Sequence, residues 1–280
     1  MPEAAPAVAA PVVTASVREL LRQGRRALTA ARSDTPRLDA ELLLADVLGV
    51  TRARLVLDAG LALDPAVIGR FEHLVARRAA REPVAYILGR RDFRRISLAV
   101  DRRVLIPRPE TELLVEVGLG LAGGARVLDV GTGSGAVALA LKQERPDLRV
   151  SAIDIDPAAL ALARENASRL GLAVRFAQAD LLDEAAYDAV LANLPYVARG
   201  SPLPPEVALY EPGRALFAGE DGLDLVRRLV ALAGGIPVVA LEVGFDQAPA
   251  VSELLRRSGC SSTERLRDLA GHERVIVGRR

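Results

Sequence analysis

Residues 126–135 read RVLDVGTGSG and join a short apolar run to a loop rich in glycine. The apolar run is typical of a buried strand, and a helical pattern begins just after the loop, near Ala136. Glycine has no Cβ, so such a loop can turn tightly and let the backbone approach a ligand closely. This strand–loop–helix unit therefore predicts the first element of a ligand-binding α/β sheet.

The alternation of strand and helix continues to the C-terminus. The expected strands are Arg126–Val130, Arg149–Ile153, Ala173–Ala177, Tyr187–Ala192, Pro237–Val243, Ser262–Leu266 and Glu273–Gly278. The expected helices are Ala136–Gln143, Ala158–Leu170, Asp224–Ala233 and Gln247–Ser258. Alternating units of this kind predict a Rossmann-like, mostly parallel sheet of seven strands with helices on both faces.

The loop Gly131-Thr132-Gly133-Ser134-Gly135 departs from the common phosphate-binding patterns. The residues that follow Gly135 do not continue the dinucleotide pattern, and no lysine follows as in a phosphate-binding P-loop. Asp154 ends the next expected strand, roughly 20 residues on, where a carboxylate can accept both hydroxyls of a ribose. A nucleoside ligand without phosphate is therefore favoured, and S-adenosylmethionine is such a ligand.

Two aspartates near the expected ligand have alternative roles. Asp154 could instead cap the following helix, but Asp156-Pro157 suits that role better, because aspartate is a good N-cap and proline fits the first turn. Asp180 follows the third expected strand, where it could contact the edge of an adenine ring. The spacing of Asp180 alone fits an ordinary loop acid equally well.

The second chemical motif is Asn193-Leu194-Pro195-Tyr196, directly after the expected strand Tyr187–Ala192. Asn193 Oδ1 and the Leu194 carbonyl can accept the N–H bonds of a planar amide or amine, and Tyr196 can pack against its plane. Pro195 fixes its own φ and favours an extended Leu194, so a stiff loop is expected. An ordinary Asn/Pro turn would explain the motif in isolation, but the carboxyl edge of such a sheet is where ligands bind. The motif predicts methyl transfer to nitrogen.

The first 80 residues have a helical pattern without clustered chemistry. Ser16, Thr51 and Asp64 stand where caps are expected, and Pro36 opens another helix. Helices joined by short connections predict a small antiparallel bundle.

These patterns divide the chain into four expected parts. They are a flexible tail (1–15), a helical bundle (16–82), a hairpin linker rich in strand formers (83–107) and the methyltransferase sheet domain (108–280).

Composition excludes several classes of protein. The chain is 50% hydrophobic and 26% charged with a formal net charge of +1, which does not favour binding to nucleic acid or to an anionic membrane. The N-terminal stretch lacks a basic region, and no apolar run approaches the ~18–20 residues of a membrane helix. The single cysteine, Cys260, excludes an intramolecular disulfide and fits a reducing compartment. A cytoplasmic protein without a metal site is expected.

Taken together, these motifs resemble the bacterial release-factor glutamine methyltransferase family over nearly the whole chain. The stretches that carry the resemblance are PVAYILG (83–89), LIPRPETE (105–112), LDVGTGSG (128–135), YEP (210–212), GEDGLD (219–224) and RVI (274–276). The resemblance implies N5-methylation, with S-adenosylmethionine as methyl donor, of the glutamine in the Gly-Gly-Gln loop of peptide chain release factors.

The resemblance also implies roles for individual residues. Cofactor contacts are implied for Gly131, Thr132, Gly133, Ser134, Gly135, Asp154, Asp180, Leu181 and Asn193. The loop from Asn193 to Tyr196 is implied to hold the substrate glutamine. The family usually has Asn-Pro-Pro-Tyr there, and Leu194 keeps the main-chain carbonyl but removes one proline.

Two other hypotheses remain open. Asn-Leu-Pro-Tyr also occurs in rRNA adenine dimethyltransferases, so adenine N6-methylation of rRNA or DNA is the alternative, although the net charge argues against it. A non-catalytic S-adenosylmethionine-binding module would not need Asn193 and Tyr196.

The helical bundle is expected to dock the protein substrate.

Overall fold

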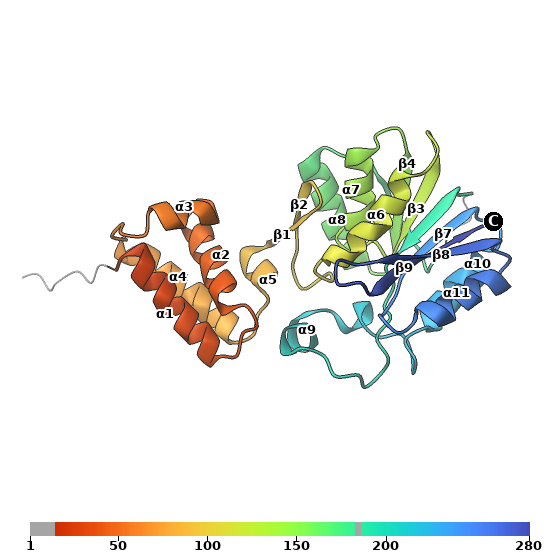
Figure 1. Cartoon of the computed structure of the whole chain (residues 1–280). Coiled ribbons are helices and arrows are strands. Elements are labelled where there is room, and N and C mark those ends of the chain that lie inside the picture. Colours follow the sequence, from red (N-terminus) through yellow and green to blue (C-terminus); the bar gives the residue numbers. More distant parts are fainter. Residues whose placement is uncertain (1–14, 183–185) are drawn as a thin grey trace, which may run out of the picture. The chain divides into compact units, whose positions relative to one another are not determined.

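The structure is a computed structural model that describes residues 15–182 and 186–280. The chain divides into two compact units, Met1–Leu88 and Gly89–Arg280, whose elements are labelled in Figure 1. The tail expected at residues 1–15 lies outside the described residues, apart from Ala15. The boundary between the units falls within the linker expected at 83–107.

The first unit is helical, as expected. Its helices are α1 (Val17–Ala30), α2 (Pro36–Leu48), α3 (Arg52–Leu57), α4 (Pro65–Ala79) and α5 (Val84–Leu88). The expected caps are confirmed: Ser16 forms a capping box with Glu19, and Thr51 and Asp64 each accept a backbone N–H of the first turn. The apolar faces of these helices meet in one core that includes the fully buried Phe71.

A buried ion pair joins α2 to α4 inside this core. Asp39 Oδ2 accepts from Arg78 Nε at 2.7 Å, and both side chains are only 6% exposed. Ser33 and Thr35 donate their hydroxyls to the same carboxylate at 2.6 and 2.8 Å. The pair is thus fully hydrogen-bonded, as a buried carboxylate must be.

The hairpin expected within residues 83–107 is only partly confirmed. Residues 84–88 form the helix α5, because the carbonyl of Pro83 accepts the N–H groups of both Tyr86 and Ile87. A short run of strand formers cannot be told from a buried helical turn by its pattern alone. The hairpin itself is shorter and consists of β1 (Arg90–Phe93) and β2 (Ile96–Ala99).

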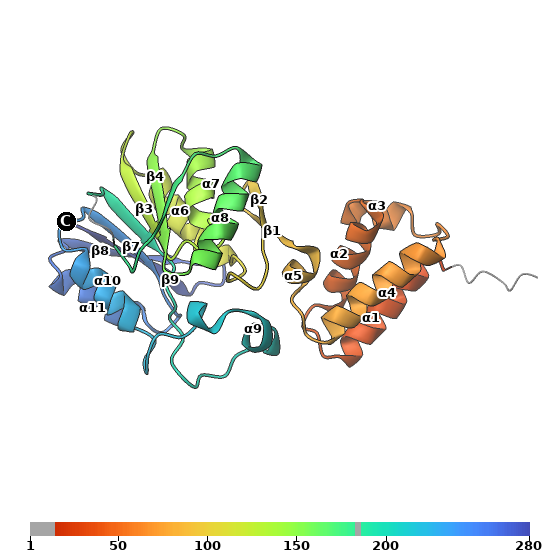
Figure 2. The same cartoon turned by 180° about the vertical axis from the view of Figure 1, so that it is seen from behind.

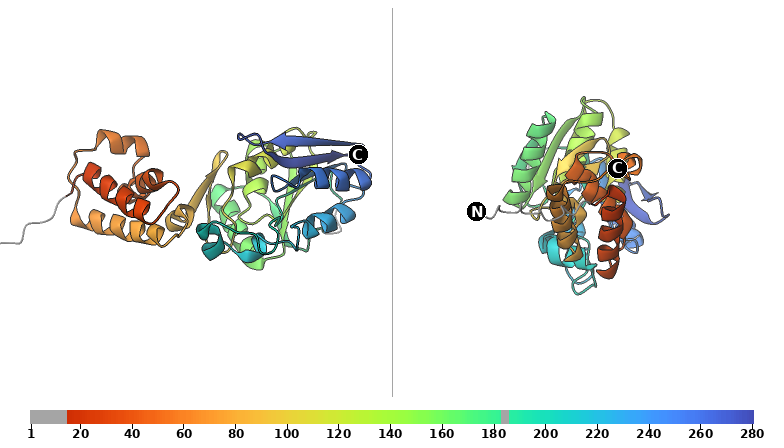
Figure 3. Two further views of the ribbon diagram at one scale, coloured as in Figure 1. Left: turned by 60° about the horizontal axis from the view of Figure 1, so that its bottom comes forward. Right: turned by 90° about the vertical axis from the view of Figure 1, so that its left-hand side faces the viewer.

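The second unit contains the expected seven-stranded sheet. Its strands are β3 (Arg126–Val130), β4 (Arg149–Asp154), β5 (Arg175–Gln178), β6 (Ala189–Ala192), β7 (Val238–Glu242), β8 (Ser262–Arg267) and β9 (Glu273–Arg279). The strand order is β5-β4-β3-β6-β7-β9-β8. Neighbours from β5 to β7 are parallel, whereas β9 is antiparallel to both β7 and β8. Figure 3 shows β8 and β9, coloured blue, lying together.

Helices cover both faces of this sheet. The helical segments of this unit are η1 (Pro109–Thr111), α6 (Glu112–Leu119), α7 (Ala136–Glu144), α8 (Pro157–Leu170), α9 (Pro205–Tyr210), η2 (Gly213–Ala215), α10 (Asp224–Leu232) and α11 (Ala248–Arg257). The side chain of Val127 on β3 packs with α6 and α7, and that of Leu128 packs with α10 and α11. Successive strand residues therefore serve opposite cores. Figures 1 and 2 show the two helical layers.

Within residues 15–182 and 186–280, no helix is both long and apolar enough to cross a membrane. The same residues contain no group of three or more His, Cys, Asp or Glu side chains placed to hold a metal ion.

Candidate active site

A cavity of about 310 Å³ lies at the carboxyl ends of β3 to β6 in the second unit. Open parallel sheets bind ligands at this edge, and small-molecule sites begin at roughly 300 Å³. Among the expected site residues, the cavity lining includes Gly131, Thr132, Gly133, Ser134, Asp154, Asp180, Leu181, Asn193, Leu194 and Pro195. Gly135 and Tyr196 are not part of the lining. The sheet thus brings both predicted motifs to one cavity.

The two motifs touch each other at Gly131. This residue follows β3 with a φ of +71°, a conformation that favours glycine. A Cβ built on it would lie 3.2 Å from Leu194 Cδ2 and 3.5 Å from the Asn193 carbonyl oxygen. A larger residue here would push the Asn193 loop away from the glycine loop.

Gly135 has a packing role. It precedes α7, and a Cβ on it would lie 2.9 Å from Leu139 Cδ1. This close approach lets the first turn of α7 pack tightly under the loop. Contact of Gly135 with the cofactor stays a prediction.

Asp129, near the end of β3, holds the glycine loop in place through hydrogen bonds. Its carboxylate accepts the Thr132 hydroxyl at 2.6 Å and the backbone N–H of Ala138 at 3.1 Å. Burial raises the pKa of the Asp129 carboxyl to about 7, against these two hydrogen bonds. The sequence motif contained Asp129, but nothing in the sequence distinguished it from an ordinary strand residue.

Asp154, at the end of β4, also binds the glycine loop through hydrogen bonds. Its Oδ2 accepts the N–H of Gly133 and its Oδ1 accepts the N–H of Asp156, both at 2.9 Å. The helix cap is Asp156, which accepts the N–H of Ala158, and this confirms the expected cap. Burial raises the pKa of the Asp154 carboxyl. Each oxygen of an ionised carboxylate can accept a further hydrogen bond, so Asp154 can still bind a ligand hydroxyl.

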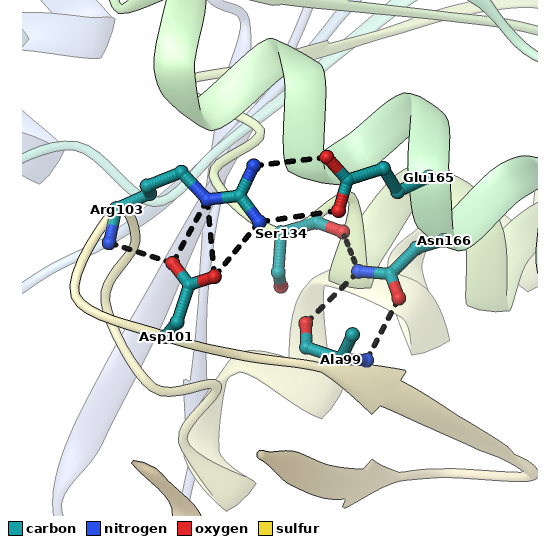
Figure 4. A network of polar contacts seen from close by, with 6 residues as sticks. All are labelled: Ala99, Asp101, Arg103, Ser134, Glu165 and Asn166. Atoms are coloured by element: carbon teal, nitrogen blue, oxygen red, sulfur yellow. Dashed lines mark hydrogen bonds and ion pairs between the residues drawn. The ribbon is translucent and has the colours of Figure 1, made fainter.

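A buried asparagine on α8 fixes the far end of the loop (Figure 4). Asn166 Nδ2 donates to the carbonyls of Ser134 and Ala99, at 2.9 and 3.0 Å. Its Oδ1 accepts the N–H of Ala99 at 2.7 Å. The glycine loop is therefore tied to β2 through one side chain. The sequence did not reveal this role, because Ala99 lies 67 residues before Asn166.

Arg103, beside this network, lines the cavity. It donates to the carboxylates of Asp101 and Glu165 at 2.7 and 2.9 Å (Figure 4). Both ion pairs are partly exposed, so they orient the guanidinium more than they stabilise the fold.

Asn193 follows β6, and its side chain is held by a threonine. Asn193 Nδ2 donates to Thr111 Oγ1 at 3.0 Å. This bond turns Nδ2 toward η1 and leaves Oδ1 on the opposite side of the amide. Thr111 also lines the cavity but was not expected as a site residue.

Tyr196 is anchored through its backbone. Its carbonyl accepts from Gln247 Nε2 at 2.9 Å, and burial raises the pKa of its hydroxyl to about 12. The expected contact of its ring with a substrate amide stays a prediction.

The other end of the cavity carries Asp180 and Leu181. Asp180 Oδ2 accepts from Arg228 Nη2 at 2.7 Å, and both of these side chains are about half exposed. Leu181 is buried and has a φ of +71°, which is unusual for a residue with a side chain. Backbone strain of this kind often marks a binding site.

Comparison with known proteins identifies the family. Residues 19–89 match the family model described as the PrmC N-terminal domain, and residues 109–203 match the methyltransferase small domain. The release factor glutamine methyltransferase of Deinococcus radiodurans is 41% identical over 275 residues, which cover 94% of this chain and 98% of that protein. The chain belongs to the release factor glutamine methyltransferase family. The family member from Burkholderia pseudomallei is 44% identical over 262 residues, covering 86% of this chain and 91% of that protein.

Solved structures agree on the fold. The hMettl16 catalytic domain, in complex with a MAT2A 3′UTR hairpin, has a TM-score of 0.57 at 18% identity and covers 74% of this chain and 81% of that one. At that identity the likeness shows the methyltransferase fold and nothing of the substrate. Family membership makes the chain a methyltransferase, and neither adenine methylation nor a non-catalytic module is favoured by the relatives.

Proposed function

We propose that this family member transfers a methyl group from S-adenosylmethionine to the N5 nitrogen of the glutamine in the Gly-Gly-Gln loop of peptide chain release factors. The observation that carries the proposal is the contact of the two motifs at Gly131, which sets Asn193 and the glycine loop in one cavity. Methyl transfer requires the methyl donor and the substrate amide to bind side by side in one cavity of this kind.

The residues of the cavity fit a nucleoside with an amino-acid tail. Asp154 offers acceptors for ribose hydroxyls, while Ile155 and Leu181 give the cavity apolar walls. Asp180 would accept from an adenine amine, in competition with its ion pair to Arg228. No phosphate-binding lysine is required for such a ligand.

The chemistry requires positioning rather than a strong base. When bound, the methyl donor supplies a methyl group on a positively charged sulfur. The nitrogen forms a bond to the methyl carbon as the carbon–sulfur bond breaks, and an N–H proton then leaves to water. Asn193 Oδ1 and the Leu194 carbonyl accept the two amide N–H bonds, which aligns the nitrogen and raises its electron density. Pro195 and the buried Leu194 side chain keep these acceptors in place.

We propose further that the bundle of residues 16–82 docks the release factor. A glutamine side chain is too small to give selectivity, since specific protein interfaces bury more than ~1,000 Å². Val56, Leu57 and Leu61 are 74%, 78% and 55% exposed, and they supply an apolar surface for such a contact.

The test uses purified enzyme with methyl-labelled S-adenosylmethionine and three acceptors. These are a release factor, the same factor with its Gly-Gly-Gln glutamine replaced by alanine, and rRNA. We expect label only in the unaltered release factor. Label in rRNA alone would replace the proposal with adenine methylation, and label in the altered factor would place the methyl group elsewhere.

A further inference from the structure

Next to Asn193, the buried side chains of Thr111 and Glu242 form a polar relay. Thr111 Oγ1 accepts from Asn193 Nδ2 at 3.0 Å, and the Thr111 hydroxyl lies close enough to the side chain of Glu242 to lower the pKa of that carboxyl. Thr111 is 4% exposed and Glu242 is 2% exposed. The register of the sheet explains the proximity, because Ala192 of β6 pairs with Leu241 of β7, one residue before Asn193 and Glu242.

The chemistry of the three groups decides which of them donates a proton and which accepts it. An ionised carboxylate only accepts, so Thr111 must donate its single proton to Glu242. The Thr111 oxygen then presents lone pairs to Asn193, and only Nδ2 of that amide can donate to them. The other end of the amide, Oδ1, is thereby directed away from Thr111, to the side where a substrate N–H needs an acceptor.

We infer that Thr111 and Glu242 are positioning residues that select the productive orientation of the Asn193 amide. Without them, the two orientations of the amide would be similar in energy, and one would aim an NH₂ group at the NH₂ group of the substrate. This inference rests on the proposed function, since it assumes that Asn193 holds the substrate amide.

The relay also predicts a pH dependence of the chemical step. The groups that face Glu242 are Glu110 of η1, Arg108 just before it, Arg274 of β9 and Tyr196 after β6. Burial raises the pKa of the Glu242 carboxyl to about 7; Glu110 adds to the rise, while Arg274 and Arg108 oppose it. Tyr196 stays neutral near this pH, because burial raises its own pKa to about 12.

Protonation of Glu242 would remove the preference for the productive orientation of the Asn193 amide. A protonated carboxyl can donate to Thr111, which frees the threonine proton to bond Asn193 Oδ1 with the amide turned over. Activity that needs the ionised form is present above the pKa and lost below it. With a pKa of about 7, kcat at saturating methyl donor should fall about tenfold between pH 8.5 and pH 6.

Three variants of the full-length enzyme test the inference with release factor as substrate. Thr111→Val keeps the shape but removes the hydroxyl, and we expect kcat to fall about 10²-fold, the cost of a misplaced catalytic group, with the affinity for S-adenosylmethionine unchanged. Thr111→Ser keeps the hydroxyl and should restore most of the rate. Glu242→Gln offers an acceptor that does not titrate, so its kcat should lose the acid limb seen in the unaltered enzyme.

Equal rates for Thr111→Val and Thr111→Ser would overturn the inference. If Thr111→Val loses cofactor binding through misfolding, the pH profile of Glu242→Gln decides, and an acid limb like that of the unaltered enzyme would refute it. Failure of the proposed function has a different signature, because the unaltered enzyme would then leave the release factor unlabelled.

Discussion

Replacing Asn193 by alanine tests the centre of the proposed site. The side chain follows β6 and is held by its 3.0 Å bond to Thr111, so its Oδ1 is pre-oriented before substrate arrives. The change removes one of two acceptors for the substrate amide. The glycine loop should keep its shape, since Asp129, Asp154 and Asn166 hold it independently of Asn193.

The expected size of the effect follows from that geometry. Removing one preorganised group that stabilises developing charge costs roughly 2.7–4 kcal/mol, or about 10²–10³-fold in kcat. The backbone carbonyl of Leu194 remains, so the loss should stop near that limit. We therefore expect kcat for Asn193→Ala to fall by this factor with little change in the affinity for S-adenosylmethionine.

The assay measures single-turnover methyl transfer to release factor together with cofactor binding by calorimetry. Asn193→Asp is the matched variant: it keeps an acceptor of the same size but loses the donor to Thr111 and adds a negative charge near Glu242. We expect it to be slow as well. A rate for Asn193→Ala within threefold of the unaltered enzyme would show that the substrate amide is held elsewhere.

Three further expectations concern the cofactor, the bundle and the division of labour between the units. Asp154→Ala should weaken S-adenosylmethionine binding by roughly 1.5–3 kcal/mol per lost charge-assisted bond, and unchanged affinity in calorimetry would move the ribose contact elsewhere. Asp39→Ala removes the buried ion pair with Arg78 and the acceptor of the Ser33 and Thr35 hydroxyls, and should lower the free energy of unfolding by about 3–5 kcal/mol in a urea titration. The matched Glu41→Ala breaks only pairs with exposed arginines and should cost about 1 kcal/mol or less; equal losses in the two variants would contradict this account. A chain beginning at Pro83 should bind cofactor but methylate intact release factor slowly, and rates equal to those of the full chain would assign the bundle a purely structural role.

The sheet was predictable because its signals are local. Each of the seven strands expected in the sheet corresponds to a strand of the structure, and Asp156 caps α8 as short-range rules predict. The helix at 84–88 was mistaken for a strand, since five apolar residues carry no period that separates the two. The helix α9 was missed because its six residues are too few to show a helical period, and none of them is buried.

The part of the site that depends on local sequence motifs was also predictable, but the contacts between distant residues were not. A motif that ends a parallel strand must reach the carboxyl edge of the sheet, so Gly131, Asp154 and Asn193 could be brought together from sequence alone. The partner that orients the Asn193 side chain could not be predicted from the sequence, because this partner, Thr111, lies 82 residues earlier in the chain.

Glu242 shows why such partners escape sequence analysis. As the last residue of an apolar strand it has the pattern of a strand end facing solvent, yet the neighbouring β9 and the residues around η1 bury it. Its Oε2 makes no hydrogen bond to any described residue, a costly arrangement for a carboxylate inside a protein. Natural sequences tolerate local costs of this kind chiefly where function requires them. The cost at Glu242 is consistent with a role in orienting Asn193, and it arises only once the sheet has formed.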